Sequence, residues 1–101
     1  MILEIAQIQV RQGQGAQFQA TFLAAQKIIQ SMPGYLGHEL QKCIEHVEHY
    51  MLLVRWESVD HHEIGFRKSA GYQEWRKLLH GFYEPFPAVL HYVQVAGVST
   101  V

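Results

Sequence analysis

The spacing of apolar residues divides the first third of the chain into a strand and a helix. Residues 2–10 carry four apolar side chains on one face, which predicts a strand: Ile2, Ala6, Ile8 and Val10. After a polar, glycine-rich break at residues 12–15, apolar side chains recur at helical spacing from Gln17 to about Gln30: Phe18, Phe22, Ala25 and Ile29. Pro33 and Gly34 end this helix, because proline cannot continue it and glycine allows the turn.

The rest of the chain is predicted to contain three more strands and a helix in two pieces. Strands are expected at residues 35–44 and 49–57, joined by a hairpin connection at residues 45–48. Ser58 is suited to cap a helix over about residues 59–66, and Ser69 a second helix over about residues 70–79. An aromatic-rich loop leads to a last strand at residues 89–95, and residues 97–101 are expected to fray.

This order of elements, strand–helix–strand given twice, predicts an α+β fold. The arrangement that fits it is a ferredoxin-like four-stranded antiparallel sheet with helices on one face. A chain of 101 residues has no room for a second core, so we expect a single domain over residues 1–101 with its core at about residues 2–95.

The predicted strands are more apolar than a half-exposed sheet requires. Such a strand should alternate apolar with polar side chains, but residues 50–54 are apolar throughout, and Leu3 and Ile5 point opposite to Ile2 and Ala6. Helices cover only one face, so the second apolar face needs another cover. We expect a homodimer that packs sheet against sheet, the alternative being apolar side chains that are tolerated at the surface.

Composition and charge narrow the classes of partner. A net charge of -1 without any basic run argues against nucleic-acid binding and against a polybasic membrane patch. The apolar runs are too short to span a bilayer. The single cysteine, Cys43, excludes an internal disulfide and a multi-cysteine metal site, and with no signal peptide it predicts a cytoplasmic protein.

The candidate chemistry centres on histidine. His62 and Phe66 lie one helical turn apart, so they share the inward face of the predicted helix. An imidazole beside an aromatic ring in an apolar pocket can transfer protons near neutral pH, so we take His62 as the candidate base, with His91 and His38 next. The alternative for His62 is a helix-start histidine that is bonded to a backbone carbonyl.

Aromatic residues near these histidines are candidates for binding a flat ring. The expected lining side chains are Phe66, Trp75, Phe82 and Tyr83, although they could also be ordinary core residues that close the end of the sheet. Residues 46–49 hold two histidines and a glutamate, but alternation at a hairpin separates their side chains. We therefore expect a solvated turn there and no metal site.

Several short motifs, taken in order, resemble the antibiotic biosynthesis monooxygenase (ABM) family over residues 2–95. The motifs are Met-Pro-Gly-Tyr-Leu-Gly at 32–37, Leu-Val-Arg-Trp-Glu-Ser at 53–58, His62 with Phe66 and Ser69, Trp75-Arg76, and Pro87 followed by His91-Tyr92. The resemblance implies a dimeric α+β barrel. In well-studied relatives it also implies oxidation of phenols, quinols or anthrones by dioxygen without a metal or a flavin.

The resemblance does not extend to every branch of the family. The haem-degrading branch uses a strand asparagine, a helix tryptophan and a helix histidine, where this chain has Gln7, Phe66 and Arg76. The asparagine–tryptophan pattern of some polyketide oxygenases is not reproduced either, so no catalytic residues are carried over from the family. The leading hypothesis is a cofactor-independent monooxygenase acting on a small electron-rich aromatic molecule. The alternative is a non-catalytic ligand-binding or stress-related dimer that kept the fold and lost the chemistry.

Overall fold

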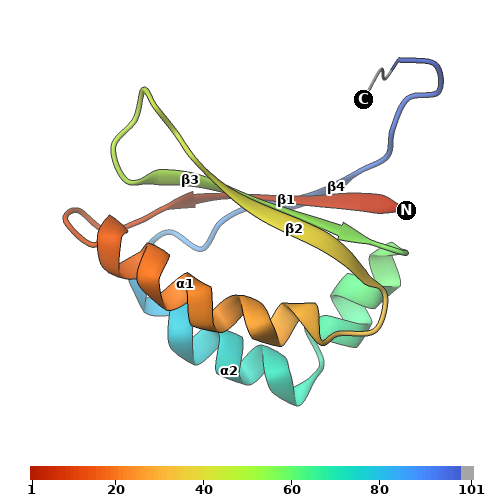
Figure 1. Cartoon of the computed structure of the whole chain (residues 1–101), viewed down its shortest axis with the longest axis horizontal. Coiled ribbons are helices and arrows are strands. Elements are labelled where there is room, and N and C mark those ends of the chain that lie inside the picture. Colours follow the sequence, from red (N-terminus) through yellow and green to blue (C-terminus); the bar gives the residue numbers. More distant parts are fainter. Residues whose placement is uncertain (99–101) are drawn as a thin grey trace.

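A four-stranded antiparallel sheet carries both main helices on one of its faces (Figure 1). The computed structural model describes residues 1–98, so the last three residues of the predicted frayed tail lie outside the described part. The elements are β1 (Ile2–Gln9), α1 (Gly15–Gln30), β2 (Tyr35–Lys42), β3 (His49–Trp56), the π-helix η1 (His61–Phe66), α2 (Ala70–Leu79), the short 3-10 helix η2 (His80–Phe82) and β4 (Val89–Tyr92). The strand order is β2-β3-β1-β4, which confirms the ferredoxin-like prediction.

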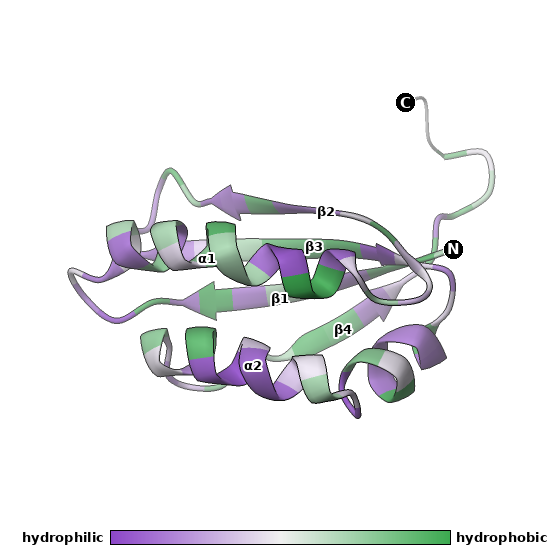
Figure 2. Cartoon of the chain, turned by 60° about the horizontal axis from the view of Figure 1, so that its bottom comes forward, coloured by the Kyte–Doolittle hydropathy of each residue, from purple (hydrophilic) through white to green (hydrophobic). Residues whose placement is uncertain are grey.

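The core lies between this sheet and the helices. Figure 2 shows α1 and α2 side by side in front of the sheet. The helical stripe predicted from the sequence is fully buried, and alternate residues of β3 face it from the sheet: Phe18, Phe22, Ala25 and Ile29 on α1, and Tyr50, Leu52, Val54 and Trp56 on β3. The apolar face of α1, with its helical spacing, therefore packs against the alternate residues of β3 in one apolar layer.

All four predicted strands are longer than the strands in the structure, β1 and β3 by one residue and β2 and β4 by more. β4 ends at Tyr92 rather than Val95, because Tyr92 already pairs with Leu3 and β1 begins at Ile2. Residues 93–98 are exposed and lead away from the sheet (Figure 1). β2 ends at Lys42 rather than Ile44, since the chain turns into the connection to β3 and leaves Ile44 94% exposed.

The two serine caps are confirmed, but the helix after Ser58 has an unexpected form. Ser58 Oγ accepts a hydrogen bond from the His61 backbone N–H, and Ser69 Oγ accepts one from that of Tyr72. From His61 onward the turns widen into a π-helix, in which the Arg67 N–H donates to the carbonyl of His62. Such wide turns are uncommon and are often found at functional sites.

The face of the sheet without helices is apolar at its centre. The strand register places Ile5 between Leu53 of β3 and Leu90 of β4, and Leu3 beside Tyr92. Leu90 is 58% exposed and Tyr92 is 47% exposed. This cluster, which we call the open-face patch, therefore presents apolar side chains to solvent in a single chain.

Candidate active site

A small cavity of about 40 Å³ lies between the helix-covered face of the sheet and α2. Its walls come from β1, η1, α2 and the segment before β4, and they include Glu4, His62, Phe66, Arg67, Trp75, Tyr83 and Phe86. This volume holds only a few water molecules. A ligand with an aromatic ring would therefore need one wall to move outward.

Glu4 is the charged residue that the strand pattern places in the core. It follows the same alternation as Ala6 and Ile8, so its side chain points toward the helices and is only 5% exposed. Its Oε1 accepts a hydrogen bond of 2.9 Å from the indole nitrogen of Trp56. Sequence reasoning missed Glu4, although a carboxylate between apolar residues on the buried face of a strand was a visible signal.

His62 connects Glu4 to His91. Its Nε2 lies 3.3 Å from Glu4 Oε1, and its Nδ1 shares a hydrogen bond of 2.8 Å with His91 Nε2. His62 is 2% exposed and its ring stacks on Trp56 at a centroid distance of 5.6 Å. His91 comes within reach because it pairs with Glu4 across β1 and β4. We call these three residues the Glu4–His62–His91 network.

Burial sets the charge of this network. It raises the pKa of Glu4 to about 6, with the Trp56 hydrogen bond and the positive charge of Arg67 acting in the opposite direction. Burial also lowers the pKa of His62 to about 3, helped by Arg67 and His91. At pH 7 the Glu4 carboxylate is therefore ionised, His62 is neutral, and the pair is able to accept one proton.

The predicted ring-binding residues are divided between this cavity and the neighbouring core. Phe66, Trp75 and Tyr83 line the cavity, and the ring centroids of Phe66 and Trp75 lie 5.5 Å apart. Phe82 is not among the lining residues and packs against Phe18 at 5.7 Å. Tyr72, which shares its helix face with Trp75, completes an edge-to-face contact with Phe66.

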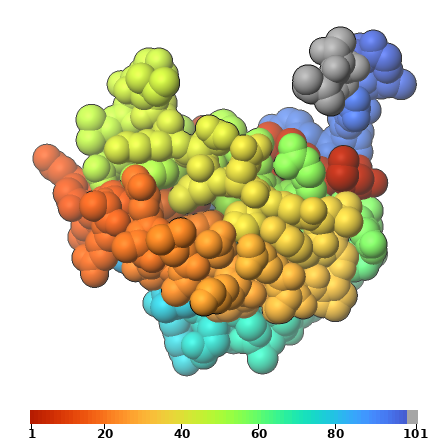
Figure 3. Space-filling view, viewed as in Figure 1, coloured from red at the N-terminus to blue at the C-terminus, as the bar shows by residue number. Residues whose placement is uncertain are grey.

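His38 lies in a different part of the molecule from His62 and His91. It is on β2, in a groove of about 340 Å³ between β2 and α1, two elements that Figure 3 shows next to each other in yellow and orange. Its ring nitrogens are bound by Tyr35 and, at 3.0 Å, by Gln26. The structure thus brings two of the three candidate histidines together and separates the third.

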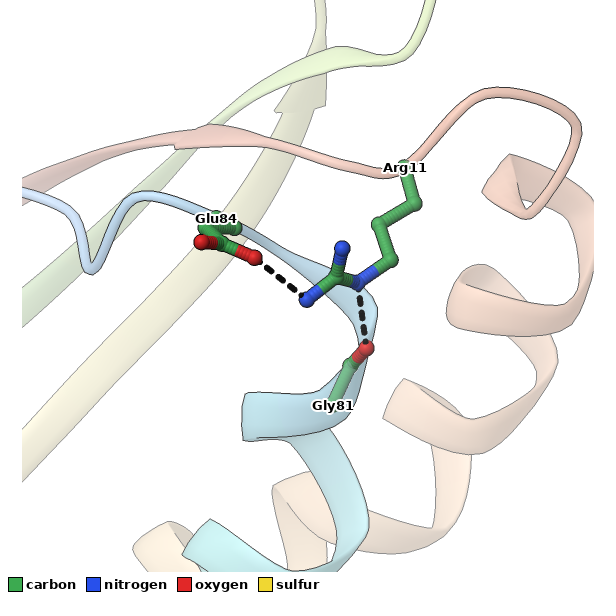
Figure 4. A network of polar contacts seen from close by, with 3 residues as sticks. All are labelled: Arg11, Gly81 and Glu84. Carbon is green, nitrogen blue, oxygen red and sulfur yellow. Dashed lines mark hydrogen bonds and ion pairs between the residues drawn. The ribbon is translucent and has the colours of Figure 1, made fainter.

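One wall of the cavity is held in place by Arg11. Its Nε donates to the carbonyl of Gly81 at 3.1 Å, and its guanidinium forms an ion pair with Glu84 at 2.8 Å (Figure 4). A single bridge between Val10 and Tyr83 joins the same two segments. These contacts tie the segment that carries Tyr83 and Phe86 to the end of β1.

The described residues hold no clear metal site and no membrane-crossing helix. His46 is exposed at the turn before β3, and its ring lies 6.4 Å from that of His49. Within residues 1–98 no three histidine, cysteine or acidic side chains are placed to hold a metal ion. No helix in that part of the chain is long and apolar enough to cross a membrane.

Comparison with known proteins gives consistent similarities. The model of the family "antibiotic biosynthesis monooxygenase" matches residues 1–78. YczJ, an uncharacterized protein of Bacillus subtilis (strain 168), is 45% identical over 95 residues, which cover 94% of this chain and 100% of YczJ. A Bordetella bronchiseptica protein, provisionally assigned to the same family, has a crystal structure with a TM-score of 0.90 and 40% identity, covering 93% of this chain and 96% of that one.

A more distant structure shares the fold. SnoaB, a cofactor-independent oxygenase from Streptomyces nogalater, is similar with a TM-score of 0.79 over 98% of this chain and 97% of its own. The two sequences are 16% identical, so this likeness concerns the fold and not the residues of the site.

Proposed function

The chain belongs to the antibiotic biosynthesis monooxygenase family, and from this premise we propose that it is a cofactor-independent monooxygenase. Its substrate in this proposal is a small electron-rich aromatic molecule of the phenol, quinol or anthrone type. The observation that carries the proposal is the Glu4–His62–His91 network, whose Glu4 and His62 are buried and line an aromatic cavity.

The network supplies what such a reaction requires from a protein. A deprotonated phenol or enol can itself give an electron to dioxygen, so the protein has to remove a proton, hold the anion and exclude water. Both nitrogens of His62 face other residues of the network, while Glu4 lines the cavity beside it. We therefore assign proton acceptance to the Glu4–His62 pair, in which His62 acts through the carboxylate and His91 supports it.

The electrons of the proposed reaction balance without an external reductant. For an anthrone, the ring CH2 group becomes a carbonyl, one oxygen atom of dioxygen enters the product, and the other leaves as water. The substrate supplies all four electrons, and the network returns its proton to the departing oxygen. The residues of the cavity need only position the ring and transfer protons.

The proposal includes a homodimer that buries the open-face patch. Leu3, Ile5, Leu53, Leu90 and Tyr92 form a contiguous apolar surface on the sheet face opposite the helices. Leaving that surface in water forgoes on the order of 25 cal/mol for each Å² of apolar area. A second copy packed sheet against sheet would bury ~1,600 Å² or more, the range of stable interfaces.

Oxygen uptake tests the proposed activity directly. Purified protein, freed of metal by a chelator, is mixed with a panel of quinols, anthrones and phenols, and dissolved oxygen is followed. We expect at least one compound to be oxidised faster than in buffer. A panel with no acceleration, together with ring binding in the cavity, would instead support the non-catalytic ligand-binding alternative.

A further inference from the structure

Arg67 places a positive charge on the wall of the cavity. It directly follows η1, its side chain is half-buried, and it lines the cavity with Glu4 and His62. None of the ion pairs found within residues 1–98 includes Arg67, and the carboxylate that its charge reaches is that of Glu4 on the same cavity wall. A cation outside the close ion pairs of the described residues, beside a buried aromatic cavity, is suited to an anionic ligand.

The charge of Arg67 reaches the titratable groups around the cavity. Burial is the largest influence on the pKa values of Glu4, His62 and His80, which come from β1, η1 and η2; the charge of Arg67 opposes the rise at Glu4, adds to the lowering at His62 and, after the charge of Arg76, adds to the lowering at His80. The tyrosines that face the same space are Tyr72 of α2 and Tyr83, and burial raises the pKa of Tyr83. No other lysine or arginine lines the cavity in the described part of the chain.

Resting on the proposed function, we propose that Arg67 binds the negatively charged oxygen that the substrate's hydroxyl becomes when the network takes its proton. The cavity then selects aromatic molecules that ionise. The O–H bond of the substrate breaks, its electron pair stays on the substrate oxygen, and the proton goes to the Glu4–His62 pair. The negative charge moves from Glu4 to the substrate, and Arg67 is the cation that stabilises it there.

The ionisation of a bound chromophore reports on this role without any oxidation. A nitrophenol absorbs visible light only as its phenolate, so its absorbance, measured without oxygen and with the protein in excess, gives its pKa when bound. The comparison uses the wild type, Arg67→Gln and Arg67→Lys. Arg76→Gln serves as the matched control, because Arg76 is exposed on α2, does not line the cavity, and lowers the pKa of His80 without being among the charges that act on Glu4 and His62.

The expected result is a bound nitrophenol that ionises more readily in the wild type than in Arg67→Gln. Loss of a cation at contact distance raises the apparent pKa of its partner anion by about one pH unit or more. Arg67→Lys should restore most of this difference, and Arg76→Gln should match the wild type. Thermal unfolding of each variant confirms that it is folded.

Three results would overturn the proposal. They are an unchanged nitrophenol pKa in Arg67→Gln, an equal change in Arg76→Gln, and failure of the wild type to bind the phenolate. Oxygen uptake separates this inference from the proposed function. If oxidation persists but the nitrophenol pKa is unchanged in Arg67→Gln, only the proposed role of Arg67 is contradicted. If the protein lowers the nitrophenol pKa but oxidises none of the compounds, the oxygenase activity is contradicted and the anion site stands.

Discussion

At the scale of single residues, burying the Glu4 side chain costs the folded protein free energy. A carboxylate that is 5% exposed loses most of its hydration, and one indole N–H and one imidazole replace only part of it. The pKa of about 6 is the consequence, since the neutral acid is favoured in the core. A carboxyl held in this state is a suitable proton acceptor near neutral pH.

The same burial predicts how stability responds to pH. Folding raises the pKa of Glu4 from 4.5 to about 6, so its favourable contribution is present below pH 4.5 and is lost as the pH rises through 6. The loss amounts to about 2 kcal/mol. Glu4→Gln removes the titration, so its free energy of unfolding relative to wild type should rise by about that amount between pH 4 and pH 7.5.

Urea unfolding of both proteins at a series of pH values measures this difference. His62 acts in the opposite direction, because its lowered pKa makes stability fall as the pH drops below 6.5. Taking the difference between two proteins that both contain His62 isolates the Glu4 contribution. A difference in the free energy of unfolding that stays constant across the series would show that folding does not raise the pKa of Glu4.

At the scale of elements, the position of η1 depends on the turn before β2. Gly34 has a φ of +81°, and a Cβ at this position would lie 2.2 Å from the His61 ring. The Gly34 carbonyl also accepts the Glu57 N–H at 2.8 Å, just after β3. The turn therefore contacts both the end of β3 and the start of η1, the segment that carries His62.

Gly34→Ala should consequently be strongly destabilising. The left-handed backbone costs an alanine roughly 1–2 kcal/mol, and the clash with the ring of His61 adds to that. The double variant Gly34→Ala with His61→Ala should recover only the part due to the ring, because the His61 Cβ, 2.8 Å away, remains. Urea unfolding of the wild type and the two variants measures these differences, and an unfolding free energy of Gly34→Ala equal to that of wild type would contradict this interpretation of the turn.

The elements also show how far local pattern can be followed. α2 begins at Ala70 as predicted, because Ser69 caps it through a contact only three residues away. The predicted end of β4 was wrong, because the strand ends where its partner β1 begins, and β1 lies at the other end of the chain. The π-helical turns of η1 were also missed, because six residues are too few to separate a wide helical period from the ordinary one.

In the candidate site, too, the features set by nearby residues could be predicted and those set by distant residues could not. His62 and Phe66 could be placed on one inward face from their spacing, and both are buried. Glu4 could not be assigned a role, because its partner Trp56 lies 52 residues away in the sequence. The link from His62 to His91 spans 29 residues and depends on the register of β4, which no periodic pattern specifies.

At the scale of the whole molecule, the two faces of the sheet have different roles. One carries the helices, the core and the cavity, and the other presents the open-face patch. We predict that the wild type sediments as a dimer at micromolar concentration. Leu53→Lys places a charge within the patch, beside Ile5, so it should shift the protein to monomer and lower its stability.

A matched substitution on the other side of the molecule controls for general effects of lysine. Leu23 lies on α1 and is 66% exposed, so Leu23→Lys should leave the dimer intact. Sedimentation of the wild type as a monomer would contradict the predicted homodimer. Equal dissociation of both variants would show that the interface is not the open face.

The central claim is that the Glu4–His62–His91 network takes the substrate proton, and one comparison tests it most directly. The value of kcat/KM for oxygen consumption is measured at pH 7 for wild type, His62→Gln and His61→Gln, the last replacing a half-exposed neighbour that does not line the cavity. The account predicts a loss of about 100-fold or more in folded His62→Gln and little change in His61→Gln. Oxidation by folded His62→Gln at the wild-type rate would contradict it.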